Sequence, residues 1–368
     1  MLSNVRCLDF TRVLAGPLAT MILGDLGARV IKVERPGTGD ETRGWGPPFD
    51  GRGESAYFLA INRNKKSIAL DLDAPDDLAV VTALLGGTDI VIDNFRPGTL
   101  EWRGIDPDVF LEQNPRLIWC TITGFGEESD RAGYDLVVQA ESGWMAITGD
   151  PEGDPMKIGV ALADAIAGKD AAIAILAALV RRSAAEPMPA EERRIYVSLI
   201  SSASASLLNV AQNVLVTGRD ARRWGNQHPN LVPYQLFHAS DRPMIVAVGS
   251  DRQWAACARA LSLTDLADDV SLESNAGRLA ERDRIVAALS ERLRLAPASE
   301  WIEKLDAAGV PCGVVKTVLE SVRDAGGSPL TGMPPAVPGS VRLMPPMLDE
   351  HGAAIRERGW DAFHETTK

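Results

Sequence analysis

The stretch VRCLDFTRVLAGPLATMILGDLGARVIKVE, residues 5–34, decides the fold of this chain. Residues 5–10 predict a short buried strand, and residues 29–34 predict a second one. Between them, residues 15–28 predict a helix that begins at a Gly-Pro pair, because proline suits the first helical turn. A strand, a helix and a strand in immediate succession form a βαβ unit, which predicts a parallel sheet.

Two further apolar runs extend this unit. DIVIDNF (residues 89–95) and RLIWCTITGFG (residues 116–126) both predict strands that end in loops with Gly or Pro. We therefore expect a doubly wound, Rossmann-like α/β domain in the N-terminal half. The first strand-to-helix turn reads LAGPLA rather than G-x-G-x-x-G, so we do not expect NAD as a cofactor.

The second half of the chain has a different pattern. The polar, proline-broken residues 181–194 predict an exposed turn, and residues 195–217 predict a helical connector into a second domain. Beyond it, PMIVAVG (residues 243–249) predicts a strand, while DRQWAACARAL and ERDRIVAALSERLRL predict amphipathic helices. Residues 307–317 predict a loop that leads into a strand, and the proline-rich residues 328–346 should wrap an outer surface.

Composition narrows the classes of function. The 368 residues carry 38 Lys and Arg against 50 Asp and Glu, a net charge of −12, so we expect neither nucleic acid nor an anionic membrane as a partner. We find no long apolar run and no basic-then-apolar leader, and we therefore expect a soluble, cytoplasmic protein. The four Cys and four His show no paired spacing, so we expect reduced thiols and no metal.

Two basic stretches and one acid are the candidate functional features. NRNKKSIALDL (residues 62–72) carries three cations that either hold phosphates or form an ordinary solvated surface. DNFRPG (residues 93–98) follows a predicted strand, where ligands of open α/β sheets bind, and the two stretches together favour a polyanionic ligand. Asp164 stands near the front of residues 159–179, which predict a buried helix. It either caps that helix or uses the room left by its small neighbours for chemistry.

Motifs spread over nearly the whole chain resemble the family III coenzyme A transferases, which include formyl-CoA transferase, carnitine CoA-transferase and the α-methylacyl-CoA racemases. In order, these motifs are AGPLATMILGDLGARVIKVERPGTGDETR, YFLAINRNKKSIALDL, DNFRPGTLEWRGI, ITGFG, AGYDLVVQAESG, GVALADAIAG, GNQHPNLVPYQLF and AGVPCG. The resemblance implies coenzyme A or an acyl-CoA as substrate, which fits local cations on an acidic protein. The positions that match the family's CoA contacts are Leu14, Ala15, Arg35, Leu70, Asp71, Leu72, Asp73, Asn94, Phe95, Arg96, Ala132, Gly133, Tyr134 and Asp135, and we add Arg103 as a phosphate ligand.

Asp164 falls at the position of the family's catalytic aspartate. The resemblance thus implies that its carboxylate attacks an acyl-CoA thioester and forms a mixed anhydride while the CoA thiolate stays bound. Return of the thiolate gives an aspartyl-CoA thioester, from which a carboxylic acid receives CoA without ATP. We expect a CoA transferase that acts on small carboxylic acids, with succinyl-CoA as a candidate donor.

A racemase is the first alternative, and a non-catalytic CoA-binding protein is the second. Racemases of the family carry GHD where this chain has GYD, residues 133–135, and proton transfer needs two bases. Tyr134 is a poor proton shuttle at neutral pH, which favours the transferase over the racemase. Its side chain either contacts the thioester or packs as a half-buried aromatic. The loop GNQHPNLVPY offers Gly225, Asn226 and His228 to the acceptor acid, although His228 can equally be an ordinary loop histidine.

The resemblance also implies the architecture. We expect residues 1–190 to form a large Rossmann-like CoA-binding domain, completed by residues 325–368 and followed by a helical linker over residues 191–221. Residues 222–317 should form a smaller α/β domain, and residues 318–368 should return as a tail to the large one. Family members form an interlocked homodimer, so the expected partners are acyl-CoA, small carboxylic acids and a second copy of the chain.

Overall fold

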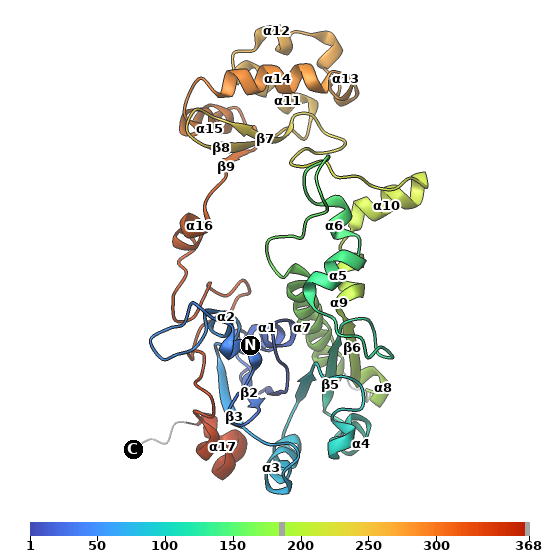
Figure 1. Cartoon of the computed structure of the whole chain (residues 1–368), viewed down its shortest axis with the longest axis vertical. Helices are drawn as coiled ribbons and strands as arrows, with labels where there is room; N and C mark the ends of the chain where they lie inside the picture. Colours follow the sequence, from blue (N-terminus) through green and yellow to red (C-terminus); the bar gives the residue numbers. More distant parts are fainter. Residues whose placement is uncertain (184–187, 365–368) are drawn as a thin grey trace. The chain divides into compact units, whose positions relative to one another are not determined.

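The computed structural model describes residues 1–183 and 188–364 (Figure 1). The chain forms two compact units, each built from separated segments. The first unit comprises Met1–Met145, Lys157–Ala221 and Val322–Lys368, and the second comprises Ala146–Met156 and Arg222–Ser321. The first unit is therefore completed only by the C-terminal part of the chain.

A six-stranded parallel sheet forms the centre of the first unit, in the order β3-β2-β1-β4-β5-β6. Its strands are β1 (Arg6–Asp9), β2 (Arg29–Glu34), β3 (Lys65–Ala69), β4 (Ile90–Asp93), β5 (Ile118–Thr123) and β6 (Arg194–Ser198). The chain starts at β1, adds β2 and β3 on one side, and then adds β4, β5 and β6 on the other. This order is that of a doubly wound sheet, which confirms the predicted Rossmann-like fold.

Apolar clusters cover both faces of this sheet. The helices on one face are α1 (Ala15–Asp25), α7 (Leu162–Arg182) and α9 (Leu199–Ala205). Those on the other face are α3 (Pro75–Leu85), α4 (Pro107–Gln113) and α17 (Gly352–Arg358). A strand that is covered on both sides must be apolar along its length, and all six residues of β5 are indeed buried.

Shorter elements complete the first unit. They are α2 (Ala56–Ile61), α5 (Asp135–Glu141), α8 (Ala190–Arg193), α10 (Leu208–Thr217), η1 (Glu41–Gly44), η2 (Glu101–Arg103) and η4 (Gly359–Phe363). Two more elements cross between the segments of the two units, namely α6 (Trp144–Ile147) and α16 (Val318–Asp324).

Helices α1 and α7 pack closely because small residues line their contact. A Cβ atom placed on Gly168 would lie only 2.4 Å from the carbonyl oxygen of Ala15. Ala163, Ala167 and Ala171 are fully buried along the same helix. The predicted helix is thus confirmed, but it is buried along one face only, since Ile173 and Val180 are 63% and 72% exposed. The small residues of the buried face serve this close approach. One helical turn before Gly168 stands Asp164, four residues away and therefore on the same face of α7.

The helix predicted over residues 195–217 is wrong in its first part. Arg194–Ser198 form the edge strand β6, and only then do α9 and α10 follow. The strand is rich in β-branched and aromatic residues, which suit a pleated surface better than a helix. Of the turn predicted for residues 181–194, residues 184–187 lie outside the described residues.

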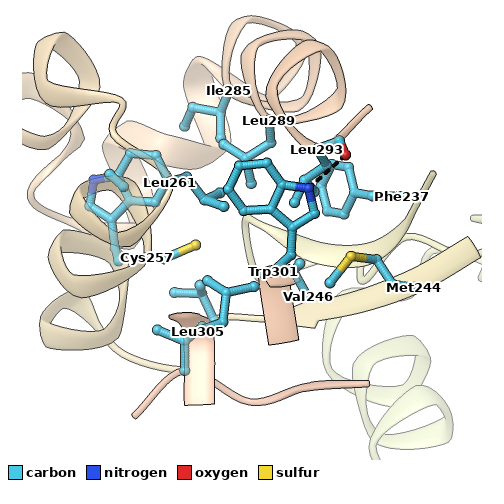
Figure 2. Close-up of a cluster of buried hydrophobic side chains, with 14 of the residues drawn as sticks. Phe237, Met244, Val246, Cys257, Leu261, Ile285, Leu289, Leu293, Trp301 and Leu305 are labelled. Carbon is cyan, nitrogen blue, oxygen red and sulfur yellow. Dashed lines mark hydrogen bonds between the residues drawn. The ribbon is translucent and has the colours of Figure 1, made fainter. Parts of the chain in front are cut away.

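A three-stranded antiparallel sheet forms the centre of the second unit, in the order β7-β8-β9. The elements of this unit are β7 (Tyr234–His238), β8 (Pro243–Ala247), α11 (Asp251–Ala260), α12 (Thr264–Ala267), η3 (Val270–Leu272), α13 (Asn275–Ala280), α14 (Arg282–Leu293), α15 (Ala298–Ala307) and β9 (Cys312–Val314). Figure 2 shows Trp301 within the apolar core, where its indole Nε1 donates a hydrogen bond of 2.8 Å to the carbonyl oxygen of Leu293. The strand and the amphipathic helices predicted for this part of the chain are confirmed.

Side chains beside β3 bind the C-terminal segment to the first unit. The backbone N–H of Ala69 donates to Asp349 Oδ1 at 2.7 Å. The Asn64 amide donates to the carbonyl oxygen of Ser340 at 2.9 Å and accepts from the backbone N–H of Arg342 at 2.6 Å. These bonds make the C-terminal segment an integral part of the unit that contains the parallel sheet.

Within the described residues, no single helix combines the length and apolar character needed to cross a membrane, and α9 and α10 pass that test only as a pair bent by 71°. The same residues contain no group of three or more His, Cys, Asp or Glu that could hold a metal ion. All four cysteines are free thiols.

Candidate functional site

Two cavities open at the carboxyl ends of the parallel strands. The first cavity, of about 280 Å³, lies where β1, β2, β3 and β4 end. The second cavity, of about 290 Å³, lies where β1, β4 and β5 end and includes Asp164. Ligands of open α/β sheets bind where the strand order reverses, which here is the boundary between β1 and β4.

The two cavities gather almost all of the CoA-contacting positions implied by the resemblance. The first is lined by Arg35, Leu70, Asp71, Leu72, Asp73, Phe95, Arg96 and Arg103. The second is lined by Leu14, Ala15, Asn94, Phe95, Arg96, Ala132, Gly133 and Tyr134. Asp135 lines neither cavity. Residues far apart in the sequence therefore meet because parallel strands end at one edge of the sheet.

Cations in the first cavity differ in how they are engaged. The Arg103 guanidinium is held by Asp73, with 2.8 Å between Nε and Oδ1, and donates to the carbonyl oxygen of Thr99 at 2.9 Å. For Arg35 and Arg96, by contrast, the described residues offer neither a hydrogen bond nor an ion pair to the side chain. These two guanidinium groups are thus available to an anionic ligand.

The three cations of the run at residues 62–72 fit neither alternative left open by the sequence, because they form neither a phosphate site nor a solvated surface. Arg63 is buried and pairs with Asp25 at 2.7 Å. Lys65 is fully buried and pairs with Asp9 at 3.1 Å, and burial lowers the pKa of its ammonium to about 8. Lys66 donates to the carbonyl oxygen of Ala362 at 2.7 Å. These cations therefore hold the unit together internally.

Asp164 does not cap its helix. Ala161 is the N-cap residue of α7, and Asp164 stands in the first turn without a capping hydrogen bond. Across the described residues, no hydrogen bond or ion pair reaches its carboxylate. Burial, and then the negative charge of Asp135, raise the pKa of Asp164 from 3.8 to about 7. The capping interpretation is wrong, and the carboxylate is free to act on a ligand.

Asp135 sets the position of Asp164 from the neighbouring helix. Asp135 Oδ1 accepts a hydrogen bond of 2.9 Å from the backbone N–H of Ala163, the residue before Asp164. Its Oδ2 accepts from Gln139 Nε2 at 2.6 Å. Asp135 therefore ties the start of α5 to the start of α7 and raises the charge density around Asp164 at the same time.

Two glycines let the loops around the second cavity meet. A Cβ atom on Gly133 would lie 2.1 Å from the Cα atom of Gly124, so neither position can hold a larger residue without moving a loop. Gly124 belongs to the ITGFG motif and Gly133 to the AGYD motif. Their contact places Tyr134, which is 61% exposed, on the wall of the cavity that contains Asp164.

Two aromatic residues near Asp164 were missed by the sequence analysis. Trp45 lines the second cavity, and its ring lies edge-on to that of Tyr57 with 5.1 Å between the centroids. Burial, and then the charges of Asp164, Asp135 and Asp40, raise the pKa of Tyr57 to about 12. For Trp45 the signal was its position in the Gly- and Pro-rich residues 44–53, where an aromatic has little apolar core to join. Tyr57 lies in α2 and carried no such signal.

The loop with Gly225, Asn226 and His228 belongs to the second unit. His228 Nδ1 accepts a hydrogen bond of 3.0 Å from the backbone N–H of Asn230, and its ring lies 5.2 Å from that of Tyr234. Burial, and then the cation of Arg282, lower the pKa of His228, which favours the neutral imidazole. In this unit His228 organises its own loop.

The site combines guanidinium groups that can bind a polyphosphate with a carboxylate that has no partner. Both lie at the switch point of a doubly wound sheet. This combination suits an acyl transferase whose substrate carries a nucleotide. Comparison with known families defines the class, and the chain belongs to CoA-transferase family III, whose family model matches residues 2–329. It is a family III acyl-CoA:carboxylate CoA-transferase, as the motifs predicted.

Named relatives cover most of the chain. A human succinyl-CoA:glutarate CoA-transferase is 42% identical over 320 residues, which are 86% of this chain and 72% of the human protein. A succinate–glutarate CoA-transferase of Agrobacterium fabrum is 40% identical over 88% of this chain and 82% of its own. The crystal structure of a CaiB/BaiF family protein from Brucella suis aligns with a TM-score of 0.82 at 37% identity, over 96% of this chain and 97% of that one.

Proposed function

We propose that this transferase moves CoA between succinyl-CoA and a dicarboxylic acid such as glutarate, with Asp164 as the nucleophile. The observation that carries the proposal is the unengaged, half-buried carboxylate of Asp164 on the wall of the second cavity. The names of relatives at 40% and 42% identity support the choice of succinate and glutarate. The free guanidinium groups of Arg35 and Arg96 suit the phosphates of CoA.

The proposed chemistry proceeds through two covalent forms of Asp164. Its carboxylate oxygen attacks the thioester carbonyl carbon, the C–S bond breaks, and the electron pair leaves with the CoA thiolate. The thiolate then attacks the aspartyl carbonyl of the mixed anhydride, which releases succinate and leaves an aspartyl-CoA thioester. An incoming carboxylate repeats the two steps in reverse order and departs as the new acyl-CoA. The thioester bond energy is conserved throughout, so no ATP is needed.

The environment of Asp164 suits a nucleophile of this kind. A carboxylate whose pKa is about 7 is more basic than an ordinary one and still half ionised near neutral pH. The bound acyl-CoA must cover the half-buried carboxylate, because water at this position would hydrolyse the anhydride. In the first turn of α1, Pro17 has no N–H, and the N–H of Leu18 donates to the carbonyl oxygen of Leu14. No side chain caps the helix, so the N–H groups of Ala15 and Gly16 are available to the oxyanion that forms on the thioester carbonyl.

We infer in addition that two copies of the chain assemble into an interlocked homodimer. An apolar cavity of about 700 Å³ lies between α1, α7 and residues 327–337, and Ile173 of α7 is 63% exposed beside it. Exposed apolar side chains gathered around such a cavity are typical of a protein interface. In such a dimer the loop with Gly225, Asn226 and His228 contacts the acceptor acid. Light scattering at several concentrations tests the assembly, and a monomer at all of them would contradict it.

The decisive experiment traps the enzyme during turnover. Incubation with succinyl-CoA followed by hydroxylamine should convert Asp164 to a hydroxamate, which peptide mass spectrometry locates. Asp164→Asn, which has the same shape and no nucleophilic carboxylate, is the matched control and should remain unmodified. An unmodified Asp164 in the active wild type would refute the proposal. Entry of solvent deuterium at the α-carbon of a 2-methylacyl-CoA would then identify a racemase.

A further inference from the structure

The loop between β1 and α1, residues 10–14, forms part of the wall beside Asp164. Val13, Leu14 and Ala15 all line the second cavity together with that carboxylate. Val13 has a φ of 71°, in the left-handed region that a β-branched residue rarely adopts. Such a conformation persists only where surrounding groups enforce it. The question is which side chains enforce it here.

Three side chains from other elements hold the backbone of this loop. The Asn94 amide binds both sides of Arg12, accepting from its N–H at 3.0 Å and donating to its carbonyl oxygen at 2.8 Å. Lys32 Nζ donates to the carbonyl oxygen of Thr11 at 2.7 Å. Asp40 Oδ1 accepts from the N–H of Val13 at 3.3 Å, and it is the side chain bound to the strained residue itself.

Asp40 is in turn fixed by its surroundings. Its side chain is completely buried, and the Lys32 ammonium lies 3.0 Å from its Oδ2. Its Oδ1 also accepts from the N–H and the hydroxyl of Thr42, at 3.0 and 2.8 Å. Lys32 binds the backbone of Thr11 and Asp40 binds that of Val13, so this ion pair holds the loop on both sides of Arg12. An acceptor held this rigidly can define the conformation of Val13.

We propose that Asp40 is a positioning residue for acyl transfer. It holds Val13 in its left-handed conformation, and this conformation fixes the backbone of Leu14 and Ala15 beside Asp164. The proposal rests on the function proposed above, because it assigns Asp40 a role in that same site. The competing explanation is that Asp40 only stabilises the turn η1, which it caps through Thr42.

A double-mutant cycle separates the two roles. Asp40→Ala should lower kcat by about 10- to 100-fold, as expected when a reacting group is displaced by about 1 Å. In a Val13→Gly background the same change should cost far less, because glycine adopts a positive φ without being held there. Thr42→Val is the matched control, since it removes a bond to Asp40 without touching Val13, and it should change kcat little.

The outcomes are distinct. Equal losses from Asp40→Ala in both backgrounds, or an equal loss from Thr42→Val, would overturn the positioning role. If Asp40→Ala does not fold, Asp40→Asn is measured in its place. Its amide oxygen keeps an acceptor for the N–H of Val13, so kcat should stay close to that of the wild type, and a loss of about tenfold or more would overturn the positioning role. Trapping of Asp164 in the wild type is measured in parallel. If Asp164 is trapped but Val13→Gly does not reduce the loss caused by Asp40→Ala, only the role of Asp40 is refuted. If Asp164 is not trapped, the proposed function is refuted and this role with it.

Discussion

Replacing Asp135 by asparagine should make the enzyme more active in mild acid. Asp164 must be ionised to attack a thioester, and its pKa of about 7 means that roughly a tenth of it is ionised at pH 6. Burial is the larger cause of the raised pKa and remains in Asp135→Asn. The charge of Asp135 is the second cause, and loss of one like charge lowers a carboxyl pKa by about 1.

The acid limb of kcat/KM against pH should therefore move from a midpoint of about 7 to about 6 in Asp135→Asn. At pH 6 the ionised fraction of Asp164 rises from about a tenth to about a half, so kcat/KM increases roughly fivefold, with little change at pH 8. The asparagine oxygen still accepts from the N–H of Ala163, which preserves the start of α7, whereas the bond from Gln139 Nε2 is lost because an amide nitrogen cannot accept it. Initial rates with succinyl-CoA from pH 5 to 9 measure the limb.

Glu141→Gln provides the control for this prediction. It removes the same charge from the same helix, but at an exposed position where Glu141 pairs with Arg131 at 2.6 Å. Its acid limb should coincide with that of the wild type. An acid limb that stays near pH 7 in Asp135→Asn would show that Asp135 does not control the ionisation of Asp164, and the electrostatic argument would fail.

Three further predictions concern stability and loop contact. The pKa of Asp164 is about 7 in the folded protein and 3.8 in an ordinary aspartate, so its ionisation destabilises the fold by up to about 4 kcal/mol as the pH rises from about 4 to about 7. Asp164→Asn removes this cost. Its thermal midpoint should therefore exceed that of the wild type at pH 8, and by a smaller margin at pH 5. Gly168→Ala places a Cβ 2.4 Å from the carbonyl oxygen of Ala15 and should lower the free energy of unfolding by about 1–3 kcal/mol in urea titrations, and an unchanged midpoint would contradict the close packing of α1 and α7. Gly124→Ala places a Cβ 2.4 Å from the Cα of Gly133 and should weaken CoA binding measured by calorimetry, whereas unchanged affinity would show that this loop contact does not shape the cavity.

The strands β1, β2, β4 and β5 could be predicted because they are buried on both faces and therefore read as largely apolar runs. The strand β6 was missed for the opposite reason. It is a partly exposed edge strand of five residues, and the helical pattern of α9 begins directly after it at Leu199. No turn residue separates the two elements, so periodicity alone extended the helix backwards over Arg194–Ser198.

The partners of buried charged residues could not be predicted from the sequence. Because Lys65 and Arg63 stand together in the sequence, they were interpreted as either phosphate ligands or part of a solvated surface. Their actual partners, Asp9 and Asp25, stand 56 and 38 positions away, and only the folded sheet brings them into contact. The raised pKa of Asp164 is invisible for the same reason, because burial and the neighbouring Asp135 are properties of the fold.

The return of the C-terminal segment to β3 has a consequence for synthesis of the protein. Asp349, which accepts the hydrogen bond from Ala69, is translated 280 residues after it. At roughly 5–20 residues per second, β3 waits on the order of 15 s to 1 min on the ribosome before this partner exists. During that time the whole of the second unit is translated and can form its own core, while the sheet edge at β3 is open to other nascent chains. We therefore expect the yield of folded enzyme to depend on chaperones that shield this edge until translation ends.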